Sequence, residues 1–101
     1  MDIATKIGGN TGVLELRGRF DFSAHRAFRE SYDALLTNPV VTDLNINLAG
    51  VEYMDSSALG MLLMLRERTT GAGKKLVLSR PNSTVTQILD IANFPKLFTI
   101  L

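Results

Sequence analysis

The most constraining feature of the sequence is a strand pattern that continues almost directly into a helix start. Every second residue of the segment 43–48 is apolar, beginning at Leu44, which is typical of a strand with one buried face. After a short turn, the segment 51–54 leads into three polar residues, and a helix is expected to follow them and run to about Thr70. A strand followed by a helix of this length favours a right-handed crossover to a parallel neighbouring strand.

The N-terminal part of the chain predicts a hairpin and a first helix. The segments 3–7 and 13–17 alternate between apolar and polar residues, and the Gly- and Asn-containing segment 8–10 joins them as a turn. Ser23 is expected to cap a helix that runs to about Leu36, because apolar residues recur there at spacings of three and four.

The C-terminal part repeats the alternation of strand and helix. We expect a strand over 75–79, a helix from about Ser83 and a short last strand within 97–101. The resulting order, β-β-α-β-α-β-α-β, predicts an α/β fold with a mixed sheet of four to five strands and helices packed mainly on one face. A length of 101 residues fits one domain, so residues 1–101 are treated as a single unit.

Composition narrows the classes of function. Lys and Arg number 11 against 10 Asp and Glu, and the longest basic cluster is Lys74 with Lys75, so no direct nucleic-acid binding is predicted. The absence of cysteine excludes disulfides and thiolate ligands, and favours a reducing, cytoplasmic location. With one histidine and no phosphate-binding glycine loop, no metal and no cofactor are predicted. No apolar run approaches the roughly 18 residues that a membrane span needs.

The sequence contains few residues that could form a catalytic site. His25 is the only imidazole that could act as a base for a serine nucleophile, and a hydrolase is the enzyme class it would serve. Asp21 and Asp55 could form a carboxylate pair, but many domains contain two such acids. The flanking glycines of a nucleophile elbow are absent around Ser56. We therefore predict a binding protein rather than an enzyme.

The polar turn formed by Asp55, Ser56 and Ser57 has two compatible interpretations. Asp and Ser are among the commonest helix caps, and a cap contributes about 1 kcal/mol. The first turn of a helix also has unpaired N–H groups and a partial positive charge, so a phosphate on a serine there is locally stabilised. Such a phosphate beside Asp55 would repel a partner matched to a neutral hydroxyl.

The helix after this turn is more apolar than one buried stripe requires. The segment 59–65 contains leucines and methionines at nearly every position. One interpretation is a well-buried central helix. The other is that Met61 or Met64 reaches the surface, where a flexible methionine suits a partner protein.

The segment 55–60, Asp-Ser-Ser-Ala-Leu-Gly, resembles the signature of the STAS domain, the fold of bacterial anti-sigma factor antagonists. The resemblance extends over essentially the whole chain, including the early Gly-Arg-Phe-Asp turn that ends at Asp21 and the late segment 88–98. Ala58 stands where glycine is common in the family, and Asn47 stands where the strand often carries Asp. Ala58 is a good helix former, so the turn should tolerate it.

The resemblance implies a phosphorylation switch. Stand-alone members bind an anti-sigma factor when unphosphorylated, and a serine kinase, often the anti-sigma factor itself, phosphorylates the serine after the motif Asp. A PP2C-type phosphatase removes the phosphate. By position Ser56 is the phosphoacceptor and Ser57 the fallback, with Asp21, Asp55, Ser57, Ala58 and Met61 expected to support partner binding.

The alternative implied by the resemblance is a structural STAS subunit of a membrane transport complex, such as a bacterial lipid-transport complex. In that role Ser56 would be a contact residue without phosphorylation. Nucleotide binding has also been suggested for some STAS domains, but no loop in this sequence supports it.

Overall fold

The computed structural model describes residues 1–101, which form one five-stranded sheet in the order β1-β2-β3-β4-β5. The strands are β1 (Asp2–Gly8), β2 (Thr11–Phe20), β3 (Asp43–Met54), β4 (Lys75–Ser79) and β5 (Thr99–Ile100). β1 pairs with β2 in antiparallel fashion, and every other neighbouring pair is parallel. The mixed α/β sheet predicted from the sequence is confirmed.

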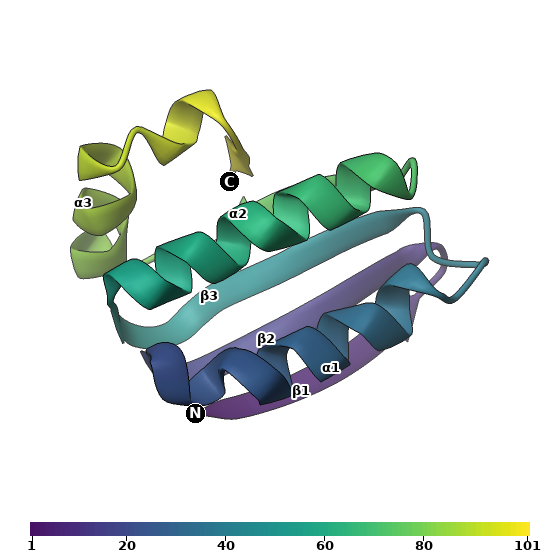
Figure 1. Cartoon of the computed structure of the whole chain (residues 1–101), viewed down its shortest axis with the longest axis horizontal. Helices are drawn as coiled ribbons and strands as arrows, with labels where there is room; N and C mark the ends of the chain where they lie inside the picture. The colour runs from purple at the N-terminus through teal and green to yellow at the C-terminus, as the bar shows by residue number, and fades with distance from the viewer.

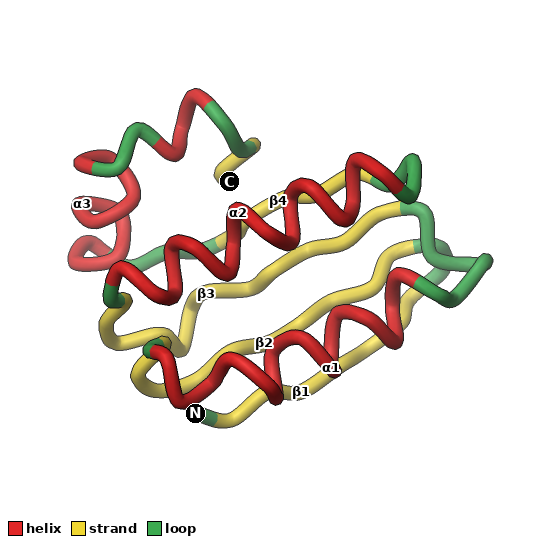
Figure 2. Tube along the Cα trace, in the orientation of Figure 1, coloured by secondary structure: helices red, strands yellow, loops and turns green.

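Three α-helices connect these strands: α1 (His25–Leu36), α2 (Ser56–Gly71) and α3 (Ser83–Ile91). α1 and α2 lie side by side along one face of the sheet, while α3 stands at the end of the sheet near the start of α2 (Figure 1, Figure 2). The prediction that helices pack mainly on one face is thus confirmed. No helix combines the length and the apolar character needed to cross a membrane.

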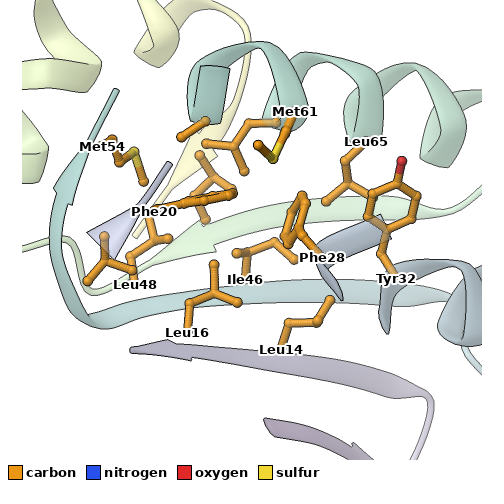
Figure 3. Packing of buried hydrophobic residues seen from close by; sticks show 14 of the residues in the cluster. Leu14, Leu16, Phe20, Phe28, Tyr32, Ile46, Leu48, Met54, Met61 and Leu65 are labelled. Atoms are coloured by element: carbon orange, nitrogen blue, oxygen red, sulfur yellow. The ribbon is translucent and has the colours of Figure 1, made fainter. Parts of the chain in front are cut away.

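The hydrophobic core fills the space between the sheet and the two long helices. It consists of 22 buried apolar residues, and the alternating positions of β2 and β3 supply its lower layer. The rings of Phe20 and Phe28 meet with centroids 5.0 Å apart, and Phe28 packs edge-on against Tyr32 (Figure 3). The opposite face of the sheet is polar and carries an ion pair of 3.0 Å between Lys6 and Glu15. One buried face and one polar face account for the alternation of apolar and polar residues in these strands.

The predicted start of the first helix is wrong. Ser23 does not cap α1; instead Asp21 accepts the Ser23 N–H at 3.0 Å and caps a short 3-10 helix, η1 (Phe22–Ala24). α1 then begins at His25 without a side-chain cap. Ser23 cannot act as the cap because it lies inside this 3-10 helix and its hydroxyl donates to the Asp21 carboxylate.

The turn predicted after residue 48 is also absent, because β3 continues unbroken to Met54. β2 follows the long strand through two register shifts, between Glu15 and Arg17 and between Gly18 and Arg19. Gly50 makes this close pairing possible: a Cβ there would lie 2.7 Å from Arg17 Cγ and 2.8 Å from the Leu16 carbonyl oxygen. The extension brings the C-terminal end of β3 to the turn where α2 begins.

Two short elements complete the C-terminal part. Asn82 accepts the Val85 N–H at 2.8 Å and so caps α3. A 3-10 helix, η2 (Phe94–Lys96), then leads to β5 and places Phe94 in the core. Asn82 also donates to the Val51 carbonyl oxygen at 2.8 Å, so the start of α3 is held against β3 close to the turn that precedes α2.

Candidate functional site

The turn between β3 and α2 is held by Asp55. Its backbone is extended, and its carboxylate accepts the Ala58 N–H at 2.9 Å, which caps α2. The Asp55 N–H donates to the Phe20 carbonyl oxygen at 3.2 Å, so the end of β2 is joined to the same turn. The predicted capping role of this polar segment is confirmed, and Asp55 is the residue that performs it.

The two serines that follow are left free by this cap. Ser56 is exposed and Ser57 is partly buried, and neither hydroxyl makes a hydrogen bond within the chain. Both lie in the first turn of α2, where backbone N–H groups carry a partial positive charge. The arrangement therefore offers an accessible hydroxyl at a place that tolerates added negative charge.

Ser56 and Ser57 face different hollows of the surface. Ser56 lines an apolar hollow of about 280 Å³ between the turn and α3, together with Tyr53, Leu59 and Ile91. Ile91 is 84% exposed there, and Tyr53 is 40% exposed. Ser57 instead lines a groove of about 380 Å³ between α1 and α2. The two hollows share no residue.

Asp21 lies near this turn, because the carbonyl oxygen of the preceding residue, Phe20, accepts a hydrogen bond from the Asp55 N–H. The hydrogen bond from the Ser23 hydroxyl lowers the pKa of Asp21 below its ordinary value of 3.8, with smaller contributions from the Ser23 N–H and from the charge of Arg19. The Arg19 guanidinium in turn lies 4.9 Å from the centre of the Tyr53 ring. The ends of β2 and β3 at this turn thus carry the Asp21 carboxylate and an arginine held over an aromatic ring.

Two residues expected to support partner binding are buried. Ala58 is fully buried and Met61 is 7% exposed, because both lie on the side of α2 that packs against the core. Met61 reaches the floor of the groove, and the expected support of partner binding by Ala58 and Met61 stays a prediction. Of the two methionines considered from the sequence, Met64 is the one at the surface, with 53% of its area exposed.

His25 stands at the start of α1 and also lines the groove. Its ring stacks on that of Phe22 with centroids 5.8 Å apart, and no hydrogen bond joins it to Ser57. No group of three metal-ligating side chains occurs in the structure. Asn47 lies on the polar face of the sheet, where its side chain accepts the Ala49 N–H at 2.9 Å.

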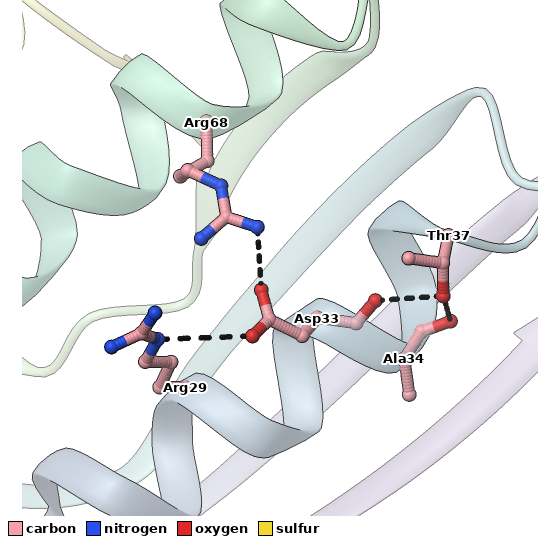
Figure 4. A network of polar contacts seen from close by, with 5 residues as sticks. All are labelled: Arg29, Asp33, Ala34, Thr37 and Arg68. Atoms are coloured by element: carbon pink, nitrogen blue, oxygen red, sulfur yellow. Dashed lines mark hydrogen bonds and ion pairs between the residues drawn. The ribbon is translucent and has the colours of Figure 1, made fainter.

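The groove between α1 and α2 was not predicted from the sequence, and neither was the place of Phe22, Arg29 and Arg68 in its lining. Arg68 of α2 donates to Asp33 of α1 at 2.9 Å, and Arg29 approaches the other carboxylate oxygen at 3.8 Å (Figure 4). The arginines come from two helices, and Asp33 and Arg68 are 35 positions apart. Only the spacing of Arg29 and Asp33 on one helix was visible locally.

Comparison with known proteins finds a family model described as "Mlab, STAS domain", which matches residues 3–100. A STAS-domain containing protein of Pseudomonas aeruginosa is 39% identical over 92 residues, which is 91% of this chain and 89% of that protein. An anti-sigma F factor antagonist of Lysinibacillus sphaericus is 31% identical over 83 residues, which is 81% of this chain and 70% of that protein.

Solved structures with the same fold include the anti-sigma factor antagonist SpoIIAA in its unphosphorylated form, with a TM-score of 0.82 and 20% identity. That match covers 99% of this chain and 88% of SpoIIAA. The Bacillus protein SpoIIAA in its phosphorylated form has a TM-score of 0.75 and 19% identity, and the match covers 99% of this chain and 91% of that chain. The STAS domain of a SulP transporter from Vibrio cholerae has a TM-score of 0.74 and 24% identity, and the match covers 94% of this chain and 75% of that chain. At these identities the likeness shows the fold alone.

Proposed function

The chain belongs to the STAS domain family, and on that premise we propose that it is an anti-sigma factor antagonist of the cytoplasm. It binds an anti-sigma factor that is also a serine kinase, and it releases that partner when Ser56 is phosphorylated. A PP2C-type phosphatase restores binding. Support comes from the relative named as an anti-sigma F factor antagonist, and from SpoIIAA, whose fold has been solved in both phosphorylation states.

The proposal rests on one observation: at the start of α2, the capping residue and the candidate phosphoacceptor are different residues. Asp55 provides the cap, so Ser56 is exposed with a hydroxyl that the fold does not use. Phosphorylation of Ser56 would therefore leave the hydrogen bond between Asp55 and the Ala58 N–H in place. A hydroxyl that takes no part in the fold suits a residue that is modified and restored repeatedly.

Phosphorylation of Ser56 changes the surface rather than the fold. The phosphate adds a charge of about −1.5 to −2 next to the Asp55 carboxylate, and the free N–H groups of α2 stabilise it locally. The same charge lies at the rim of the apolar hollow that contains Ile91 and Leu59. A partner side chain seated in that hollow would meet repulsion and the cost of desolvating the phosphate.

The test is a pull-down from native-cell lysate with wild type, Ser56→Ala and Ser56→Asp as baits, analysed by mass spectrometry. Wild type and Ser56→Ala are expected to retain a kinase-domain protein, and Ser56→Asp is expected to lose it. Ser57→Asp is the matched control, since its charge lies in the other hollow, and it should retain the partner. Loss with Ser57→Asp alone would contradict the assignment of the switch to Ser56, and equal retention by all four baits would refute the switch.

A second candidate is a structural subunit of a membrane transport complex. It is favoured by the likeness to the STAS domain of a SulP transporter and by the apolar residues exposed around Ser56. In that role the hollow is a permanent contact surface. The same pull-down separates the two functions, because a membrane ATPase or transporter would then be retained by wild type and by Ser56→Asp alike.

A further inference from the structure

The groove between α1 and α2 combines an apolar surface with an excess of positive charge. Phe22, Phe28, Met61 and Met64 line it, with His25, Arg29 and Arg68 beside them and no carboxylate among the lining residues. Arg29 and Arg68 share the single carboxylate of Asp33 at the edge, so one positive charge is left uncompensated. Such a groove matches a ligand that is both apolar and acidic.

The groove runs lengthwise between two helices. α1 and α2 run in the same direction along one face of the sheet (Figure 1), and the groove follows α2 from Ser57 to Arg68. That separation corresponds to about 16 Å, or three helical turns. Phe22 is 70% exposed and Met64 is 53% exposed, so large apolar side chains stand at the surface on both walls.

Gly60 is an independent indication that another chain approaches here. It lies in the second turn of α2, is exposed, and lines the groove. A Cβ on Gly60 would meet no atom within 4 Å, so nothing in this chain requires glycine at a position where alanine would favour the helix. A glycine is needed on a helix surface when another backbone packs closely against it.

We propose that the groove between α1 and α2 binds an acidic amphipathic helix of a partner protein. The apolar face of that helix lies over Gly60 between Phe22 and Met64, and its carboxylates pair with Arg29 and Arg68. This mode uses apolar anchors at helical spacing and the adaptability of methionine. The surface is separate from the Ser56 hollow, so this inference does not depend on the role of Ser56.

Ser57 lies within this groove, and a negative charge there opposes the binding of an acidic helix. The same charge on Ser56 lies in the other hollow and has no such effect. Adjacent serines therefore provide a matched pair of variants with the same substitution. Met64 and Leu63 provide a second pair, since both are exposed on α2 but only Met64 lines the groove.

The probe is a fluorescein-labelled acidic peptide of about 18 residues, long enough to form helix, with leucines at i, i+3, i+4 and i+7 and glutamates on its flanks. Saturable binding to wild-type protein is expected by fluorescence anisotropy, and added salt should weaken it. Met64→Gln and Ser57→Asp should each weaken binding about tenfold, whereas Leu63→Gln and Ser56→Asp should bind like wild type. Circular dichroism melts establish that each variant is folded.

Two further peptides test the chemistry: one of the same composition without helical periodicity, and one with lysine in place of each glutamate. Neither should bind. The proposal is overturned if wild type shows no saturable binding, if Met64→Gln and Leu63→Gln bind alike, or if the scrambled peptide binds as well. It is also overturned if octanoate occupies the groove while the peptide does not, or if the groove joins two copies of this chain in a dimer that Met64→Gln abolishes.

Discussion

At the scale of single residues, the start of α2 shows how neighbouring polar side chains take different tasks. Asp55 accepts the Ala58 N–H and also ties the turn to Phe20 through its own backbone. Ser56 then has no structural duty. A carboxylate and a hydroxyl are about equally good caps, and a negatively charged group is in addition favoured by the partial positive charge of the helix end.

Asp21 plays the same structural part at η1, and its ionisation can be followed directly. Because its pKa is lowered in the folded protein, its contribution to stability is present above its ordinary value of 3.8 and is lost as the pH falls through the lower folded value. Ser23→Ala removes the largest cause of the shift, so we expect the Asp21 pKa to rise toward 3.8. Carbon-detected NMR titration of the carboxyl group measures it, and an unchanged midpoint would contradict this assignment.

At the scale of elements, α2 illustrates why a helix can be apolar almost all round. One side, including Leu62 and Leu65, packs into the core, while Met64 and Leu63 remain at the surface. The helix therefore serves the core and two outer surfaces at once. Gly60 lies on one of those outer surfaces and contributes nothing to the packing of the chain.

Gly60→Ala is accordingly expected to stabilise the isolated domain by about 0.5–1 kcal/mol, because alanine loses less conformational freedom in a helix and meets no neighbour. Gly50→Ala is expected to be destabilised instead, since its Cβ would collide with Arg17 and the Leu16 carbonyl oxygen. Urea denaturation followed by circular dichroism measures both. A destabilised Gly60→Ala would mean that the glycine is needed by the fold itself.

Most elements could be predicted from the sequence because their signals are local. The alternation in 43–48 and the polar residues at 55–57 each determine structure within a few residues. The start of α1 was mispredicted because both the N–H and the hydroxyl of Ser23 donate to Asp21, and only the folded geometry shows that the cap lies two residues earlier. The continuity of β3 depends on register shifts in its partner strand, which no local pattern records.

The candidate site was predictable only in part for the same reason. Ser56, Asp55 and Asp21 were proposed as site residues from a contiguous motif and an early turn, and the structure places Asp55 and Ser56 at the start of α2 and Asp21 just after β2. The groove required Asp33 and Arg68 to be brought together by the packing of two helices, and this pairing leaves no trace in a single sequence. The burial of Met61 rather than Met64 depends on the rotation of α2 about its axis, which its nearly uniform apolar character does not determine.

At the scale of the whole molecule, one core supports both surfaces, so damage to it should affect all functions through the folded fraction. Phe28→Ala removes a fully buried ring that contacts Phe20 and Tyr32, and a cost of about 3–5 kcal/mol is expected. Phe22→Ala removes an exposed ring and should change stability by no more than about 0.5 kcal/mol. Thermal and urea unfolding compare the two, and similar losses would contradict the described core.

The placement of two consecutive serines in different hollows has a consequence for how much information so small a domain could hold. A covalent mark on one serine would not lie in the hollow of the other, because the two hollows have no residue in common. Modification of neither, either or both hydroxyls would give the turn four different surfaces. An enzyme that selects between neighbouring positions in one helical turn would address two separate outputs without any movement of the backbone.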